Sequence, residues 1–311
     1  MSTGFLFPSD PLRAARPDPE FAPEVTAARA TGAEVALVDH DALLAGDAAG
    51  AVGRVPRGSG PYWYRGWMVP VARYGELERA LAARGCVLLT GSGAYGRAHE
   101  LPGWYATFER ASLTPRSVWC AAAPGEPPSA ERLTELVAPL GPGPGVVKDY
   151  VKSRKHEWDE ACFVPELADT ARLSAVVGRF FALQEESLAG GLVVRAYEPF
   201  VAGGEARVWW LDGEALLVTA HPDTPDRAPA PELGAVRGAV AALGCRFVTT
   251  DLALHTDGRW RVVEVGDGQV SGLPRGAGDA ATATTTLYAG LAGVPVGRAD
   301  DVSGDSRPPS R

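Results

Sequence analysis

The sequence predicts a protein of mixed α/β and α+β class, and three observations carry this prediction. In residues 1–95, short apolar runs alternate with amphipathic segments, which is typical of a parallel sheet with helices on its faces. Residues 96–190 combine strands and helices in a less regular order. Residues 191–296 contain long apolar stretches joined by Asp-Gly turns, which predict antiparallel strands. We therefore expect three domains with these bounds, and a disordered polar tail over 297–311.

In the first domain, the apolar runs "GFLF" (4–7), "AEVALVD" (33–39) and "CVLLT" (86–90) predict strands. Residues 19–31 and 74–85 have the spacing of helices, and Gly85 is a typical helix end. The glycine-rich stretch that follows, "GSGAYGRAHELPGWY" (91–105), has neither a Walker pattern nor G-x-G-x-x-G spacing. We therefore expect an interdomain loop there, with a phosphate cradle as the weaker alternative.

The second domain is predicted to contain three strands and two helices. Ser129 is placed as the N-cap of the first helix, because Glu131 and Arg132 follow it in the first turn. The strands are expected over 117–123, 146–151 and 162–164, and the helices over 128–140 and 169–189.

The third domain is predicted to be mostly antiparallel. Turns are expected at Asp212-Gly213 and Asp257-Gly258, where the Asp-Gly dipeptide favours a tight hairpin. The strands are expected within 191–201, 205–220, 245–258 and 259–265, and a small helix over 280–293.

The composition excludes several classes of protein. The formal net charge of −8 over 311 residues argues against a non-specific nucleic-acid binder, which needs a basic face. The first residues, "MSTGFLFPSDP", lack the basic and apolar regions of a secretory signal, and no apolar run is long enough to span a membrane. We therefore expect a cytoplasmic protein whose four cysteines (86, 120, 162 and 245) are reduced, buried and not metal ligands. The oligomeric state is left open.

The lysines are distributed unusually. The chain has 27 arginines and only three lysines, Lys148, Lys152 and Lys155, all within one short segment. Lys148 lies in an apolar strand, so its side chain is expected to face something negative in the interior, and a compact ammonium suits the phosphates of a nucleotide. Lys152 and Lys155, with Ser153, would form a flexible cover over those phosphates. The alternative is that these lysines are solvated surface residues.

The hairpin "TTDLALHTDGRWRVVEVGDG" contains carboxylates within apolar strands. Alternation along the second strand places Val262 and Glu264 on one face. A carboxylate in such a strand needs compensation, and Mg²⁺ bound to Asp251 and Glu264, with Asp267 as a third ligand, would supply it. The alternative is that Glu264 pairs with an arginine such as Arg207.

A second set of charged residues lies in "VVRAYEPFVAGGEARVWWLDGE". Glu205 and Arg207 are two residues apart, so both point to the same face of their strand. A carboxylate, from Glu198 or Glu205, suits ribose hydroxyls, and Arg207 suits a phosphate or a developing oxyanion. A solvated Glu–Arg pair is the alternative.

Taken in order, these segments resemble the ATP-grasp superfamily over about residues 115–275, and the front half resembles a pre-ATP-grasp domain. The stretches "YRGWMV" (64–69), "AHELPGWY" (98–105) and "VVEVGDGQVSGL" (262–273) are similar to a small bacterial clade of largely uncharacterised ATP-grasp proteins. The resemblance implies a two-lobed ATP-grasp fold with ATP between the lobes.

The resemblance also implies roles for individual residues. Lys148 would contact the phosphates of ATP, and Arg207 would stabilise the phosphoryl group in transfer. Asp251 and Glu264 would hold Mg²⁺, and Glu205 or else Glu198 would hold the ribose. The hinge that reads adenine through its backbone would consist of Arg195, Ala196, Tyr197 and Glu198.

Two positions depart from the family pattern. Gly266 stands where the family often has a metal-binding Asn, and Asp267 is the candidate replacement. The family usually has another nucleotide lysine upstream of Lys148, and here Arg116 is the candidate substitute.

The implied activity is that of an ATP- and Mg-dependent carboxylate–amine ligase that forms an acyl phosphate, with an amino acid or short peptide as substrate. A kinase and a non-catalytic nucleotide-binding module are the alternatives. Arg65, Arg195 and Arg275 are candidates for binding a substrate carboxylate, although Arg65 equally suits a contact between domains. The five histidines (40, 99, 156, 221 and 255) show no metal spacing and are assigned no catalytic role.

Overall fold

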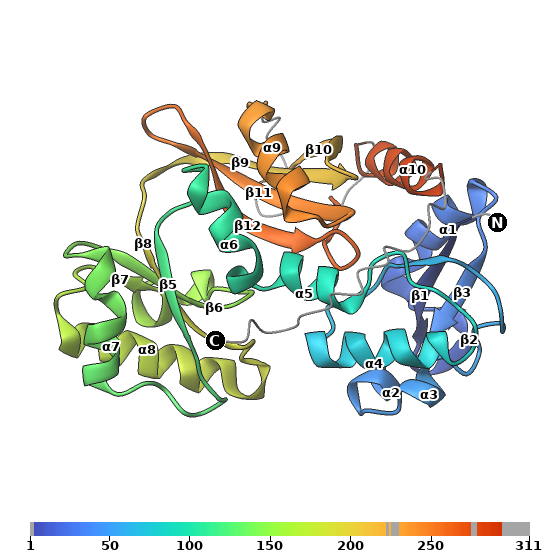
Figure 1. Ribbon diagram of the computed structural model, residues 1–311, viewed down its shortest axis with the longest axis horizontal. Helices are drawn as coiled ribbons and strands as arrows, with labels where there is room; N and C mark the ends of the chain where they lie inside the picture. Colours follow the sequence, from blue (N-terminus) through green and yellow to red (C-terminus); the bar gives the residue numbers. More distant parts are fainter. Residues whose placement is uncertain (1–2, 222–223, 225–229, 275–278, 294–311) are drawn as a thin grey trace, which may run out of the picture.

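The computed structural model describes residues 3–221, 224, 230–274 and 279–293. The chain forms three four-stranded sheets, one after another in the sequence. In Figure 1 the first sheet lies at the right, the second at the left, and the third above and between them. The predicted combination of a parallel sheet followed by two α+β lobes is confirmed. The predicted tail over 297–311 lies outside the described residues.

The first sheet is built around strand β1 (Gly4–Asp10), which runs parallel to β3 (Val35–Val38) and to β4 (Tyr62–Tyr64). Strand β2 (Arg13–Pro17) pairs antiparallel with the end of β1. The sheet is accompanied by α1 (Ala22–Ala30), α2 (His40–Leu44), α3 (Ala48–Ala51) and α4 (Val71–Ala82).

The strand expected over 86–90 is a correction. Only Leu88 forms a bridge, and its partner is Tyr62 of β4. The sequence missed β4 because it has only three residues, Tyr62, Trp63 and Tyr64, although all three are buried.

The predicted loop over 91–105 is also wrong, because this segment forms most of two helices, α5 (Ser92–His99) and α6 (Leu101–Arg110). Glu78 begins α5 by accepting a hydrogen bond from the backbone N–H of Ser92 at 3.0 Å. The glycines obscured this pattern. Gly103 is required by packing, since a Cβ there would lie 2.6 Å from the backbone oxygen of Arg97.

The second sheet has the order β5-β8-β6-β7, with every neighbouring pair antiparallel. The Ser129 N-cap is confirmed, because its Oγ accepts a hydrogen bond from the backbone N–H of Arg132. The strands are β5 (Ser117–Ala121), β6 (Gly145–Asp149), β7 (Phe163–Val164) and β8 (Gly191–Ala196), and the helices packed on them are α7 (Ala130–Val137) and α8 (Thr170–Gln184).

The third sheet has the order β10-β9-β11-β12, again antiparallel. One face packs on α5, α6 and a helix that the sequence did not predict, α9 (Gly234–Leu243). The strands are β9 (Phe200–Leu211), β10 (Glu214–Ala220), β11 (Phe247–His255) and β12 (Trp260–Asp267). The other face of this sheet is the one that carries charged residues.

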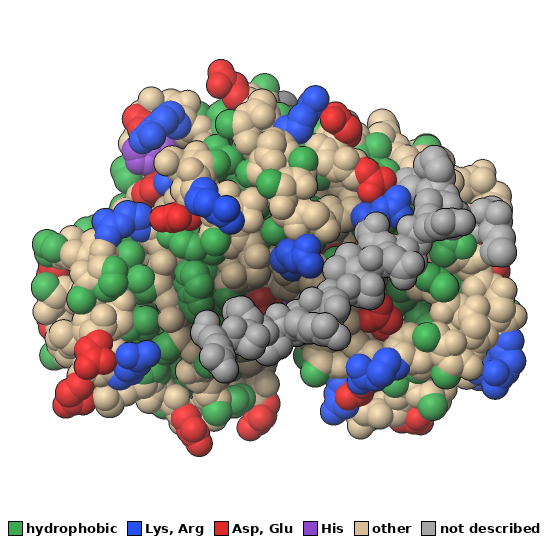
Figure 2. All heavy atoms as spheres, viewed as in Figure 1, with side chains coloured by type: hydrophobic (Ala, Val, Ile, Leu, Met, Phe, Trp, Pro, Cys, Tyr) green, Lys and Arg blue, Asp and Glu red, His purple; other side chains and the backbone are tan. Residues whose placement is uncertain are grey.

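The last helix, α10 (Asp279–Ala292), returns to the first sheet and lies beside α1 (Figure 1). Its buried residues Leu287, Tyr288 and Leu291 share one core with Phe5 and Phe7 of β1. No helix in the described part of the chain has the length and apolar character to cross a membrane. On the face drawn in Figure 2, Lys and Arg side chains are interspersed with Asp and Glu and form no single basic patch among the coloured residues.

Candidate active site

The charged face of the third sheet is set by strand register. Asp251 of β11 pairs with Arg207 of β9 on one side and with Glu264 of β12 on the other, so the three side chains share one face. Leu252 pairs with Val262, which leaves Val263 as the extra residue of a β-bulge. The bulge reverses the alternation, so Glu264 lies on the opposite face from Val262. The predicted common face of these two residues is therefore wrong.

The Arg207 guanidinium holds the Asp251 carboxylate at both oxygens. Nε and Nη2 each donate a hydrogen bond of 2.7 Å, and both side chains are nearly buried. Burial by itself raises the pKa of Asp251, but Arg207 and the nearby His221 outweigh it and hold that pKa well below its usual range. Arg207 thus pairs with Asp251, and the alternative pair with Glu264 does not form.

Glu264 and Lys148 face each other from different sheets. Burial lowers the pKa of Lys148, while the charge of Glu264 opposes this effect. Lys148 is only 4% exposed, and its Nζ donates one hydrogen bond of 3.3 Å, to the carbonyl of Val151. The Glu264 carboxylate makes no hydrogen bond or ion pair to any residue in the described ranges. The pair leaves hydrogen-bonding capacity unused on both sides.

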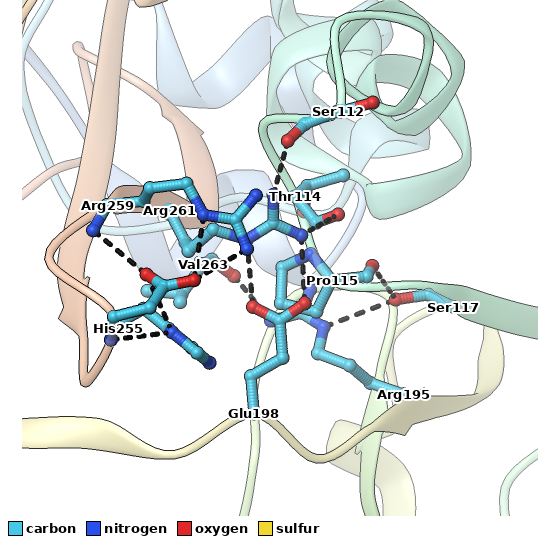
Figure 3. A network of polar contacts seen from close by, with 11 residues as sticks. Ser112, Thr114, Pro115, Ser117, Arg195, Glu198, His255, Arg259, Arg261 and Val263 are labelled. Carbon is cyan, nitrogen blue, oxygen red and sulfur yellow. Dashed lines mark hydrogen bonds and ion pairs between the residues drawn. The ribbon is translucent and has the colours of Figure 1, made fainter.

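Arg195 connects the second and third sheets (Figure 3). Its Nε donates to Ser117 Oγ at 3.2 Å, and its Nη1 donates to the carbonyl of Val263, the bulge residue, at 2.6 Å. Its Nη2 is buried and has no partner among the residues that the structure describes. Burial lowers the pKa of Arg195 to about 10, against the charge of Glu264. A buried donor without a partner is suited to an anionic ligand.

Glu198 and Glu205 differ in their commitments. Arg261 donates two hydrogen bonds of 2.8 Å to the Glu198 carboxylate and also binds the carbonyl of Thr114 (Figure 3). The Glu205 side chain is 40% exposed and lies 3.4 Å from Nδ1 of His221. Of the two predicted ribose ligands, Glu205 is therefore the more accessible.

The lysine segment is organised by Asp149, which is buried at the end of β6. One of its oxygens accepts hydrogen bonds from the backbone N–H groups of Val151 and Lys152, at 2.7 and 2.5 Å. The other accepts 2.7 Å from Nε2 of Gln184. Lys152 and Lys155 are exposed, unlike Lys148. Asp149 thus fixes the turn that follows Lys148.

The predicted hinge uses part of its backbone internally. The N–H of Ala196 donates to the carbonyl of Arg116 at 2.8 Å, and the N–H of Tyr197 donates to the carbonyl of Pro144 at 2.9 Å. The Arg116 side chain is exposed and donates to the carbonyls of Pro139 and Leu140. These groups would have to exchange partners to contact a nucleotide.

Asp267 lies at the junction with the first sheet. It is fully buried, and one oxygen accepts hydrogen bonds from the backbone N–H and the Nε2 of Gln269, at 2.9 and 3.0 Å. Gln269 also donates to the hydroxyl of Tyr74. Burial raises the pKa of Asp267 to about 7. Within the described residues, no three His, Cys, Asp or Glu side chains are grouped so as to hold a metal ion.

A cavity of about 960 Å³ lies next to this junction, lined by parts of α1 and α10, residues 65–68 and residues 270–274. Arg65 forms part of its wall but is only 1% exposed and is paired with Glu24 at 2.6 Å. Of the two roles expected for Arg65, the structure favours the contact between segments over binding of a substrate carboxylate. Arg275 lies outside the described residues.

Residues 139–291, about half of the chain, match a family model described as an ATP-grasp domain, the third family of its clade. The chain belongs to the ATP-grasp superfamily. No curated protein matches it in sequence. The ATP-grasp match covers Lys148, Arg207, Asp251 and Glu264, but it does not assign their roles.

Solved structures share the ATP-grasp fold at low sequence identity. A RimK domain ATP-grasp protein from Sphaerobacter thermophilus DSM 20745 is 16% identical, with a TM-score of 0.57, and the match covers 92% of this chain and 99% of that one. D-cycloserine synthetase DcsG is 17% identical over the same shares, also with a TM-score of 0.57. The ATP-grasp ligase PsnB, complexed with a minimal precursor, Mg and ADP, is 15% identical, with a TM-score of 0.54 and coverage of 92% and 96%.

Two residues near the ATP-grasp site were missed by the sequence reasoning. His221, at the end of β10, has Nε2 3.3 Å from Asp251, and no local spacing indicates this because Asp251 is distant in sequence. Asp149 follows Lys148 directly, and its position at a strand end before a turn was a usable signal.

Proposed function

We propose that this protein is an ATP- and Mg-dependent carboxylate–amine ligase that acts through an acyl phosphate. One observation carries the proposal: buried Lys148 and Arg195 on the second sheet face Glu264, whose strand neighbour Asp251 is paired with Arg207. Cations and carboxylates from two sheets thus meet at one place. Positioned charge of this kind is what phosphoryl transfer requires.

The proposed roles follow from these positions. Lys148 and the unpartnered Nη2 of Arg195 would bind phosphate oxygens of ATP. Glu205, as the more exposed of the two candidate glutamates, would accept hydrogen bonds from the ribose. Arg207 would stabilise charge on the group in transfer once it leaves Asp251. Lys152 and Arg116, with the backbone of residues 195–198, would complete the nucleotide site after local rearrangement.

Mg²⁺ fits one carboxylate of this site as it stands. Glu264 has no partner among the described residues, whereas both oxygens of Asp251 are held by Arg207. Mg²⁺ commonly takes one or two carboxylates together with substrate phosphates, so Glu264, joined by Asp251 after its release, would hold it. The ion would neutralise charge on the phosphates. Asp267, the proposed third ligand, would first have to leave Gln269.

The proposed substrate is an amino acid or short peptide, and it is supported by ligases among the structures that share the fold, of which PsnB carries a peptide precursor. Its carboxylate oxygen would attack the γ-phosphorus of ATP, forming an O–P bond and releasing ADP. An amine nitrogen would then attack the acyl carbon, lose its proton and release phosphate. The cavity beside residues 270–274 is the proposed place for part of this substrate. A cytoplasmic location is part of the proposal.

The test is ADP release from Mg-ATP with amino acids and short peptides, singly and in pairs. Turnover that requires both a carboxylate and an amine, with an amide product in mass spectrometry, is the expected result. Turnover with a single compound and a stable phosphorylated product would establish the kinase alternative. ATP binding without turnover on any compound would favour the non-catalytic module.

A further inference from the structure

Arg65 binds five segments that are distant in sequence. From β4 its Nε and Nη2 contact Glu24 of α1, at 2.9 and 2.6 Å, and its Nε lies 3.4 Å from the hydroxyl of Tyr288 in α10. Its guanidinium lies over the ring of Trp209 in β9, 5.7 Å from the centroid. Its Nη1 points to a fifth segment, residues 268–272, which directly follow β12. We call residues 268–272 the connector.

The connector is held mainly by this one side chain. Nη1 of Arg65 donates to the carbonyls of Gly268, Gln269 and Ser271, at 2.8, 3.1 and 2.9 Å. The same carbonyl of Gln269 accepts the backbone N–H of Gly66, next to Arg65, at 3.2 Å. A planar guanidinium can serve three carbonyls and a carboxylate at once, which an ammonium cannot.

The connector continues to Arg207. The carbonyl of Gly272 accepts a hydrogen bond of 3.2 Å from Nη1 of Arg207, whose other nitrogens hold Asp251. The connector is therefore the described partner of Arg207 that remains when Asp251 turns to a metal ion. A chain of contacts, from Arg65 through Gly268–Gly272 to Arg207, joins the first sheet to the phosphoryl site.

We propose that Arg65 is a positioning residue, which fixes the connector and thereby the orientation of the Arg207 guanidinium toward the phosphoryl group. The proposal rests on the proposed function for the role of Arg207. It replaces substrate binding as the role of Arg65. Because Lys148 and Arg195 lie on the second sheet, Arg65 has no part in their grip on the nucleotide.

The decisive variant is Arg65→Lys, which keeps the charge beside Glu24 but cannot reach three carbonyls. We expect hydrogen exchange in residues 268–272 to accelerate about tenfold, because their opening becomes easier. The kcat for ADP release should fall about 10- to 100-fold, as expected for a misplaced catalytic group, while the Kd for Mg-ATP changes less than about twofold. Glu24→Gln, which weakens the anchor of Arg65, should give the same changes to a smaller extent and covers the case that Arg65→Lys does not fold.

The matched control is Arg84→Lys. Arg84 also binds backbone carbonyls, those of Gly53 and Val55, but it contacts neither the connector nor the third sheet. Exchange in the connector, kcat and Mg-ATP affinity should all stay at the wild-type level. A loss of kcat in this control would attribute the effect of Arg65→Lys to general loosening of the first sheet and overturn the proposal.

Two further outcomes would overturn it: unchanged exchange in the connector, or faster exchange with unchanged kcat. Failure of the proposed function is recognised separately, because the wild-type protein would then release no ADP. In that case the Nε–H signal of Arg207 in NMR, identified by its loss in Arg207→Lys, decides the positioning role. The signal should exchange faster with solvent in Arg65→Lys, and an unchanged signal contradicts positioning.

Discussion

Arg207 and Asp251 form a two-point ion pair across neighbouring strands, with both hydrogen bonds at 2.7 Å. The next strand carries Glu264 directly opposite Asp251, and its carboxylate has no partner among the described residues. The two carboxylates are therefore inequivalent before any ligand binds. One is neutralised by the protein itself, and the other is available to a cation.

The first prediction concerns Glu264→Gln. Because the Glu264 carboxylate makes no bond within the described residues, its loss should leave the free energy of unfolding within about 0.5 kcal/mol of the wild type. The affinity for Mg-ATP should fall about 10- to 100-fold, while that for ATP without Mg²⁺ stays the same. Calorimetric titration with and without Mg²⁺ measures both. Glu214→Gln, at an exposed position of β10, is the control and should bind Mg-ATP normally. Equal losses with and without Mg²⁺ would contradict a metal role.

The second prediction concerns the Arg207–Asp251 pair. Arg207→Met leaves a buried carboxylate without its main partner and should lower the free energy of unfolding by about 3 kcal/mol in urea at pH 7. The double variant Arg207→Met/Asp251→Asn should recover most of this loss. Since the pKa of Asp251 is lowered by folding, its contribution is present above pH 3.8, the ordinary value, and is lost as the pH falls below it. Additive losses in the double variant would show that the pair is not coupled.

The third prediction concerns Asp267, whose pKa is raised from 3.8 to about 7 by burial. Between these values the folded protein keeps a proton that the unfolded chain has lost, so stability decreases as the pH rises through this range. Asp267→Asn resembles the protonated acid and lacks this dependence. Relative to the wild type, the variant should gain about 2–4 kcal/mol between pH 4 and pH 7.5, measured by urea unfolding at several pH values. A constant difference between the two proteins across that range would refute the raised pKa.

The fourth prediction separates the lysines. Lys148→Met should weaken Mg-ATP binding by about 10- to 100-fold, because a buried ammonium without a carboxylate hydrogen bond is available to phosphates. The same change should not reduce thermal stability, since burial disfavours the charged form. Lys152→Met removes an exposed charge and should weaken binding by less than about threefold. A larger effect for Lys152 than for Lys148 would reverse the assignment.

The sequence was sufficient to locate the charged residues of the site but not to orient all of them. Lys148, Asp251 and Glu264 stand out because each interrupts an apolar strand, and charge in such a place requires a partner. Their convergence from two sheets was inferred from the family resemblance rather than from spacing. The bulge at Val263, which turns Glu264 toward Asp251, leaves no mark in the sequence, because a bulge depends on the partner strand.

The helices between the first and second sheets were missed for a different reason. Gly93, Gly96 and Gly103 lower the expected helix content of α5 and α6, yet close packing of the backbone requires at least Gly103. Long-range contacts explain the missed His221, and they also explain why Arg65 resembled a ligand-binding arginine among aromatics. The domain bounds at residues 95 and 190 and the roles of the individual site residues stay predictions.

The packing of α10 against β1 has a consequence for exchanging parts between proteins. Leu287, Tyr288 and Leu291, from the end of the described chain, complete the core beneath its first strand, and Trp63 donates a hydrogen bond to the carbonyl of Leu291. A chimera that joins residues 1–95 to a different catalytic half would lose these three side chains and expose Phe5 and Phe7. Productive recombination therefore has to exchange both ends of the gene together, as a single discontinuous module.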